Sequence, residues 1–190
     1  MSRIIIAILA LSIGTTLLTA ESKTYAGVGV VMETVEEIES DITVDLKAGV
    51  AVEAKGGISF ENSFGVESRV TNSIIGAKGS EVFGNRKLTT EADVTTLSLF
   101  GTYTYQLIPK FAIIPKVGLT YAMIDLDIEL GDEKLEGDDD TDLSFSYGVE
   151  AQYSLTSTTD LYVGYTIYNI EFNGEKFDAS HLSIGIQKNF

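Results

Sequence analysis

Apolar and polar residues alternate along most of this chain. In the stretch DLSFSYGVEAQYSL every odd position from 143 to 155 is Leu, Phe, Tyr, Val, Ala, Tyr or Leu, and every even position is Asp, Ser, Gly, Glu or Gln. The stretch LKAGVAVEAKGGISF, residues 46–60, has largely the same period. Successive side chains of a β-strand point to opposite faces, so this period predicts strands with one apolar and one polar face.

Eight segments follow the pattern, and their connections alternate between long and short. The short ones are Glu61–Ser63, the turn at Pro109 and Thr156–Thr159; the long ones cover 33–45, 72–92 and 131–141, and 170–178 is intermediate. This order predicts an antiparallel meander with all long loops on one side. The eight segments are Thr24–Met32, Leu46–Phe60, Phe64–Thr71, Asp93–Leu107, Ala112–Leu130, Asp142–Leu155, Asp160–Asn169 and Ala179–Phe190.

The apolar parity changes inside the fifth segment. It runs through Tyr121 and Met123 and then shifts to Ile124 and Leu126. One explanation is a β-bulge near Met123. The other is that Asp125 and its neighbours have already left the membrane.

The alternation alone suits either a soluble sandwich or a membrane barrel, which turns the apolar faces outward. Three features favour the barrel: strands long enough to span a bilayer when tilted, mixed charges on the polar face, and Tyr and Phe near the strand ends. Charges inside a barrel are expected to pair across strands. They could form a packed, ion-paired interior or a gated ion path. The charges on the polar parity are Lys47, Glu53, Lys55, Glu67, Arg69, Lys116 and Glu150.

With these strands, and a terminal Phe190, the chain resembles the small outer-membrane β-barrels of Gram-negative bacteria, of the OmpX and OmpA-barrel type of the porin family. AVEAKGGISFENSFGVESRV is similar to that family's second hairpin, and LSLFGTYTYQL with KFAIIPKVGLTYA to its central one. The resemblance implies an all-β, eight-stranded antiparallel up-and-down transmembrane barrel in the outer membrane. It also implies short turns in the periplasm, long loops outside, and recognition of the Phe190 strand by the barrel-assembly machinery.

The first twenty residues differ from the rest. Arg3 precedes the apolar run Ile4–Leu18, and Thr19-Ala20 ends it. This layout predicts a secretory signal peptide over 1–20, with a retained membrane anchor as the alternative, and a barrel domain over 21–190. Lys188 stands on the outward parity of the last strand, where a lysine can extend its amine to the lipid headgroups.

The amino-acid composition limits the kinds of binding partner that we expect. The chain carries 28 Asp and Glu against 13 Lys and Arg, which argues against nucleic acid, and it has no cysteine to form disulfides. The stretches METVEEIESD and GDEKLEGDDDTD hold five acids in ten and seven in twelve residues. We expect them to form solvated loops; if they bind Ca²⁺ or Mg²⁺, the candidate ligands are Asp138, Asp139, Asp140 and Asp142.

The single histidine, His181, lies two residues before Ser183. A lipid A deacylase of similar barrel type uses a His and a Ser at that spacing. Here both share the parity opposite Leu182 and Ile184, which turns them to the interior, so we expect no catalysis and no cofactor.

The hypothesis is therefore a monomeric outer-membrane barrel, surrounded by lipid and lipopolysaccharide, with a structural or surface-interaction role through acidic extracellular loops. The alternatives are a narrow ion channel and a soluble periplasmic barrel that binds a small ligand, as lipocalins do.

Overall fold

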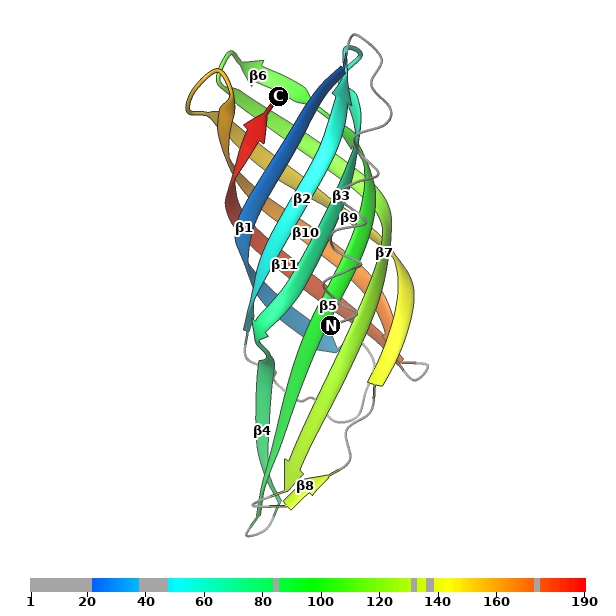
Figure 1. The fold of residues 1–190 in the computed structure, drawn as a ribbon. Helices are drawn as coiled ribbons and strands as arrows, with labels where there is room; N and C mark the ends of the chain where they lie inside the picture. Colours follow the sequence, from blue (N-terminus) through cyan, green and yellow to red (C-terminus); the bar gives the residue numbers. More distant parts are fainter. Residues whose placement is uncertain (1–21, 38–47, 84–85, 131–132, 136–138, 173–174) are drawn as a thin grey trace.

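Every regular element in the described part of the chain is a β-strand (Figure 1). The computed structural model describes the backbone of residues 22–37, 48–83, 86–130, 133–135, 139–172 and 175–190, and the side chains over most of these ranges. Among these residues no helix is long and apolar enough to cross a membrane. Eight long strands are β1 (Ser22–Glu37), β2 (Gly49–Phe60), β3 (Phe64–Ile75), β5 (Arg86–Tyr103), β7 (Phe111–Leu130), β9 (Asp139–Ser154), β10 (Thr159–Phe172) and β11 (Glu175–Asn189).

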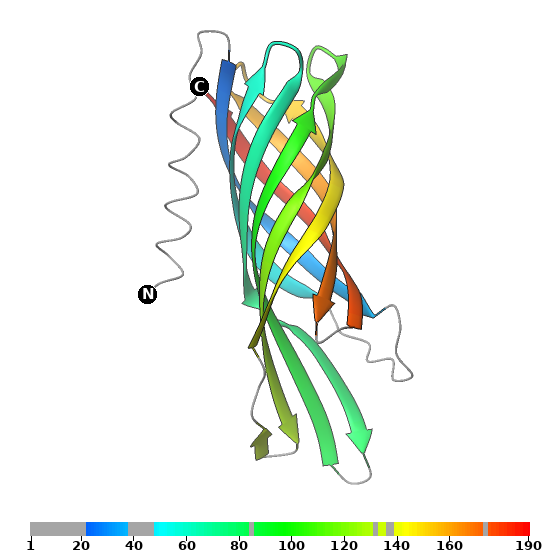
Figure 2. The same ribbon diagram turned by 90° about the vertical axis from the view of Figure 1, so that its right-hand side faces the viewer.

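The eight long strands form a closed ring. Each pairs antiparallel with the next along the chain, β5 pairs with β7, and β11 returns to pair with β1 from Tyr25↔Asn189 to Glu37↔Phe177. Figures 1 and 2 show the resulting tilted barrel. Closure leaves no open sheet edge in the wall, as a membrane requires. The predicted eight-stranded up-and-down barrel is confirmed.

The registers define the stagger of the ring. Followed from Gly29 through β2, β3, β5 and β7, the row of paired residues reaches Asp142 on β9. Followed through β11 and β10, the same row reaches Gln152, ten residues further along that strand. At about 3.3 Å per residue and about 4.8 Å between strands, this stagger tilts eight strands by about 40°.

Two of the three short strands, β4 (Ala77–Phe83) and β8 (Glu133–Leu135), correct the predicted loops. The connection 72–92 is not a loop: β3 continues to Ile75, and β4 forms a hairpin with β5. Similarly, β8 pairs with β7, and β10 and β11 extend to Phe172 and Glu175. The remaining short strand, β6 (Tyr105–Ile108), pairs with β7 beside the short turn. Outside the membrane the outer face need not be apolar, so these strand extensions carry no clear alternation.

The proposed bulge at Met123 is wrong. The register of β7 is uniform with β5 from Leu130 to Lys116 and with β9 from Phe111 to Asp125. The parity changes because inward positions of β7 become apolar: Ile124 packs inside the barrel with Ala122 and Phe100. The register shifts lie elsewhere, at Val50/Ala51 and between Gln106 and Ile108.

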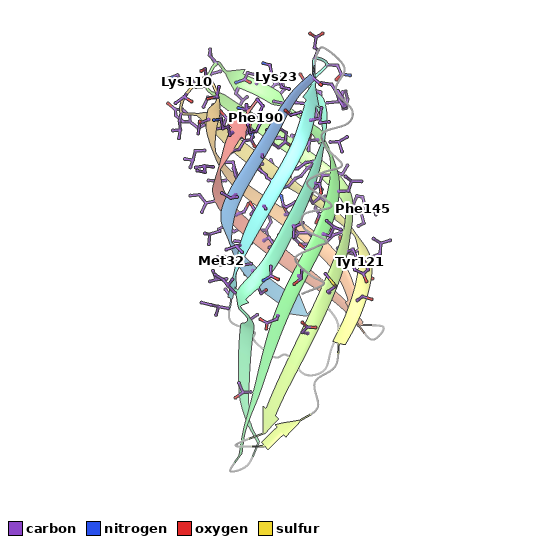
Figure 3. All side chains as sticks on the ribbon, viewed as in Figure 1. Lys23, Met32, Lys110, Tyr121, Phe145 and Phe190 are labelled. Carbon is purple, nitrogen blue, oxygen red and sulfur yellow. The ribbon has the colours of Figure 1, made fainter. Side chains whose placement is uncertain are left out.

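The two faces of the wall differ sharply. On β5, Leu99 is 59 % exposed and points outward, whereas its neighbour Phe100 is fully buried. Apolar side chains cover the outside of the barrel (Figure 3). Aromatic residues stand at the end with the short turns, where Phe64 and Tyr103 pack edge to face, 5.0 Å between ring centroids. Figure 3 places Phe190 and Lys110 at that end, and Met32, Tyr121 and Phe145 nearer the other.

Candidate functional site

The interior of the barrel contains a cluster of buried charges. Glu53 and Lys55 come from β2, Glu67 and Arg69 from β3, and Glu150 from β9 across the ring; each is at most 4 % exposed. Alternation places them on one face of their strands, and closure brings β9 opposite β2 and β3. Lys116 on β7 is buried nearby, whereas Lys47 lies outside the described residues.

Arg69 is the centre of this cluster. Its guanidinium donates to Glu53 at 3.0 Å, to Glu67 at 2.8 Å and to Glu150 at 2.8 Å. One planar donor group therefore joins three carboxylates from three strands. A buried charge is stable only with such partners, because burial removes its hydration.

Lys55 is the second cation of the cluster. Its amine donates to Glu150 at 2.6 Å, lies 3.7 Å from Glu67, and sits 3.6 Å from the centroid of the Tyr162 ring. Lys55 and Arg69 thus share Glu150 and Glu67, which links the N-terminal strands to the C-terminal half of the barrel.

Lys116 is held differently. Its amine has no hydrogen-bond partner among the described residues and lies 5.1 Å from the centroid of the Phe100 ring. It nevertheless balances the charge of this cluster, in which Glu53, Glu67 and Glu150 face Lys55, Arg69 and Lys116.

Two tyrosines reach the carboxylates across glycines. Tyr162, Gly185, Gly29 and Glu53 occupy one register row on four adjacent strands. The Tyr162 hydroxyl donates to Glu53 at 2.7 Å, over the two glycines, and a Cβ at Gly29 would stand 2.6 Å from that oxygen. The hydrogen bond crosses the β1–β11 seam that closes the ring.

The same arrangement occurs at Tyr25. Its partner across the strand is Gly57, whose own partner on β3 is Glu67, and the Tyr25 hydroxyl donates to Glu67 at 2.9 Å. The sequence pattern predicts neither tyrosine as part of the interior network. The only signal is a glycine beside each tyrosine on the neighbouring strand, and that signal requires the register.

A second polar group lies nearer the long-loop end. Glu33 accepts a hydrogen bond from Ser73 at 2.5 Å, and His181 Nε2 lies 3.3 Å from its other oxygen. The His181 ring also packs on Tyr168, 4.5 Å between centroids. Ser183 faces inward as well, but its hydroxyl donates to the Gly164 carbonyl at 3.4 Å. His181 is therefore oriented towards Glu33 and Tyr168.

The candidate cation ligands lie largely beyond the described side chains. Asp138 is outside the described residues, and the backbones of Asp139 and Asp140 pair with Asp125 and Ile124 at the start of β9. Among the described side chains, no group of three or more Asp, Glu or His is placed to hold a metal ion. The divalent-cation site stays a prediction.

Phe190 ends the chain at the seam. Its backbone N–H donates to the Thr24 carbonyl at 2.9 Å, and its ring is 72 % exposed on the outside. The amine of Lys188 lies 5.9 Å from the centroid of this ring. The role of Phe190 as an assembly signal stays a prediction.

The closed barrel carries apolar side chains outside and charged side chains inside, which defines an integral membrane β-barrel. The family model for the outer membrane protein beta-barrel domain matches residues 4–190, so the chain belongs to that family and lies in the outer membrane. The predicted family and location are confirmed, and the soluble lipocalin-like alternative is wrong. No curated protein matches the chain.

Solved structures share the fold at low sequence identity. The chain is similar to the attachment invasion locus protein Ail of Yersinia pestis, with 12 % identity, TM-score 0.59, and coverage of 90 % of this chain and 99 % of Ail. It is similar to Neisserial surface protein A with 16 % identity, TM-score 0.58, and coverage of 88 % and 97 %. A major outer membrane protein from Thermus thermophilus gives 13 % identity, TM-score 0.60, and coverage of 88 % and 99 %.

Proposed function

We propose that this protein is a non-catalytic scaffold that presents an acidic surface outside the cell to a cationic partner. The observation that carries the proposal is a small sheet formed by β4, the outer halves of β5 and β7, and β8, which projects beyond the barrel at the long-loop end (Figure 2). With the short turns in the periplasm, as in the resembling barrels, this projecting sheet extends outside the cell.

Acidic residues stand opposite one another in this sheet. Asp93 pairs with Asp125, and Glu91 with Asp127, on β5 and β7; Asp125 also pairs with Asp139 on β9. Like charges directly opposite each other repel, so this row of acids gives the projecting sheet a negative surface. That negative surface supports binding of a cationic partner.

A protein of this fold binds an anionic ligand, opposite in charge to the cationic partner proposed here. Ail has been solved in complex with the heparin analogue sucrose octasulfate, a polyanion, and resembles this chain with 13 % identity and TM-score 0.57. The formal charge of the present chain is −15, and its long loops are acidic, so repulsion opposes the same ligand here.

The interior of the barrel favours a scaffold role and argues against an ion channel. In an eight-stranded barrel the lumen is just wide enough to be filled by side chains. Arg69, Lys55 and Glu150 bridge it by mutual ion pairs, which leaves the charges engaged with one another and not with passing ions.

The test is binding of a fluorescent lysine-rich peptide to the protein in phosphatidylcholine proteoliposomes. We expect saturable binding that weakens with salt, and a several-fold weaker affinity for the variant Asp93→Asn/Asp125→Asn. The control Glu61→Gln removes an exposed acid at a short turn and should bind as the wild type does. Binding no greater than to protein-free vesicles, or equal loss in the control, would contradict the proposal.

A further inference from the structure

The outer wall of the barrel carries a groove in the middle of its apolar surface. The groove measures about 580 Å³ and lies over β11, β1, β2 and β3. Mostly small or branched side chains line it, together with Asn72 and Glu53, and the backbones of Gly29 and Gly185 lie between them. The opposite wall instead exposes larger side chains such as Leu99, Leu119 and Phe145. The outward groove residues include Val28, Val30, Val52, Ala54, Ile184 and Ile186.

We propose that this groove binds one phospholipid of the periplasmic leaflet, with an acyl chain along the groove and the phosphate at Lys188. The proposal rests on the orientation given above, with the short turns in the periplasm, and does not involve the extracellular partner.

Lys188 supplies the charge that a phosphate requires. It continues the outward row of β11 after Ile184 and Ile186, and its backbone pairs with Ala26 beside the groove residue Val28. Four residues of strand from Ile184 to Lys188 span about 13 Å along the strand and, at a tilt of about 40°, about 10 Å along the membrane normal, which brings Lys188 from the groove towards the headgroups at the edge of a roughly 30 Å hydrocarbon core. Lys188 is exposed at the end of this apolar groove, and its positive charge is complementary to an anionic headgroup.

The groove exists because of the sequence of its four strands. Their outward positions at this level hold valine, alanine and isoleucine, with Asn72 at the edge, whereas the opposite wall exposes leucines and a phenylalanine. A flexible hydrocarbon chain restores the dispersion contacts that such a hollow lacks. Phe190, with its ring 5.9 Å from the Lys188 amine, stands at the headgroup level as interfacial aromatics do.

The experiment measures phospholipid binding to the full chain by native mass spectrometry, with phosphatidylglycerol titrated into detergent micelles. Wild-type protein should form a saturable complex with one phosphatidylglycerol. In Lys188→Gln the dissociation constant of phosphatidylglycerol should rise about fivefold, which is the contribution of one basic residue at a membrane surface. Val28→Phe fills the groove and should raise the dissociation constant of phosphatidylglycerol at least about threefold.

Two matched controls separate a site from general lipid contact. Lys110→Gln removes an exposed lysine at a short turn on the other side of the ring, and Val117→Phe enlarges an equally exposed valine of β7. Both should bind phosphatidylglycerol as the wild type does. Heat-modifiable migration of each variant on a gel verifies that the barrel is folded before binding is compared.

Three results would overturn the proposal. The first is equal affinity in all variants, which indicates general lipid contact. The second is displacement of phosphatidylglycerol by stoichiometric lipid A, which assigns the groove to the other leaflet. The third is a dimer mass that Val28→Phe abolishes, which assigns it to a second copy of this chain. None of these results bears on peptide binding at the extracellular end, so the two proposals fail separately.

Discussion

Arg69 illustrates what a buried charge needs inside this barrel. Its three carboxylate partners are themselves at most 4 % exposed, and two of them, Glu67 and Glu150, are shared with Lys55. A single substitution therefore affects the hydrogen bonding of several residues at once, and its effects will not add simply to those of its neighbours.

Arg69→Met should lower the free energy of unfolding by about 3–5 kcal/mol, because it leaves three buried carboxylates with one close cation. Urea titration of the protein in micelles, followed by tyrosine fluorescence and gel migration, measures the change. The control Lys110→Met removes an exposed lysine and should change the free energy of unfolding by less than about 0.5 kcal/mol. Equal stability of the two variants would contradict a stabilising role for the cluster.

The inward glycines at the seam are required by the tyrosine that crosses them. A Cβ at Gly185 would collide with the Val28 carbonyl oxygen and with the Tyr162 ring, and the carbonyl cannot move without disturbing the β1–β11 ladder. Gly56, on the outward face of β2, has its nearest neighbour at 3.6 Å from such a Cβ, the Tyr25 carbonyl oxygen.

Gly185→Ala should therefore destabilise the barrel by about 1–3 kcal/mol through overpacking, whereas Gly56→Ala should be close to neutral. The urea midpoint of each variant gives the comparison. A similar midpoint for both would show that the seam tolerates a methyl group and that the row of glycines is not needed.

At the scale of elements, the β4–β5 hairpin and the barrel are separable. β4 pairs with β5 over Ala77–Phe83, whereas the wall of the barrel is completed by β3, β5 and β7 from Asn72↔Thr95 onwards. The interior charges all lie on the barrel side of this boundary.

Replacing residues 78–91 with a short turn should leave the barrel folded. The thermal midpoint in micelles should fall by only a few degrees, since the cluster around Arg69 and the seam are untouched. Gel migration before and after heating measures the folded fraction. Loss of the folded band would show that the hairpin is part of the folding unit, against the independence inferred from the registers.

At the scale of the whole molecule, the interior charges connect the two ends of the chain. Tyr162 reaches Glu53 across the seam, and Glu150 reaches Lys55 and Arg69 across the lumen. These contacts can form only once β11 has met β1, so they stabilise the closed ring.

The closed ring should not conduct. Wild-type protein in a planar bilayer is expected to give current no greater than the protein-free membrane, because ion-paired side chains occupy the lumen. The variant Lys55→Ala/Arg69→Ala, where it folds, removes two of the bridging side chains and should admit ions. Steady wild-type channels would contradict the scaffold and favour the ion-path alternative.

The sequence by itself determined the class of fold. Period-two alternation in segments such as 142–155 and the alternating connection lengths define eight amphipathic strands, because each strand must present one face to hydrocarbon. Beyond the membrane that requirement ends, which is why the sequence of 77–92 carries no alternation and predicts a loop where the structure has paired strands. The apolar shift at Ile124 was ambiguous for the same reason, since parity cannot separate a bulge from an apolar interior.

Only the tertiary structure decided which inward charges meet. The residues 53, 55, 67, 69 and 150 could be named from parity, but their partners depend on a stagger of ten residues around eight strands, and no local pattern encodes that number. The same stagger places Tyr162 beside two glycines and collects the small outward residues of four strands into one groove. Strand faces are a local consequence of alternation, whereas register is a property of the closed ring.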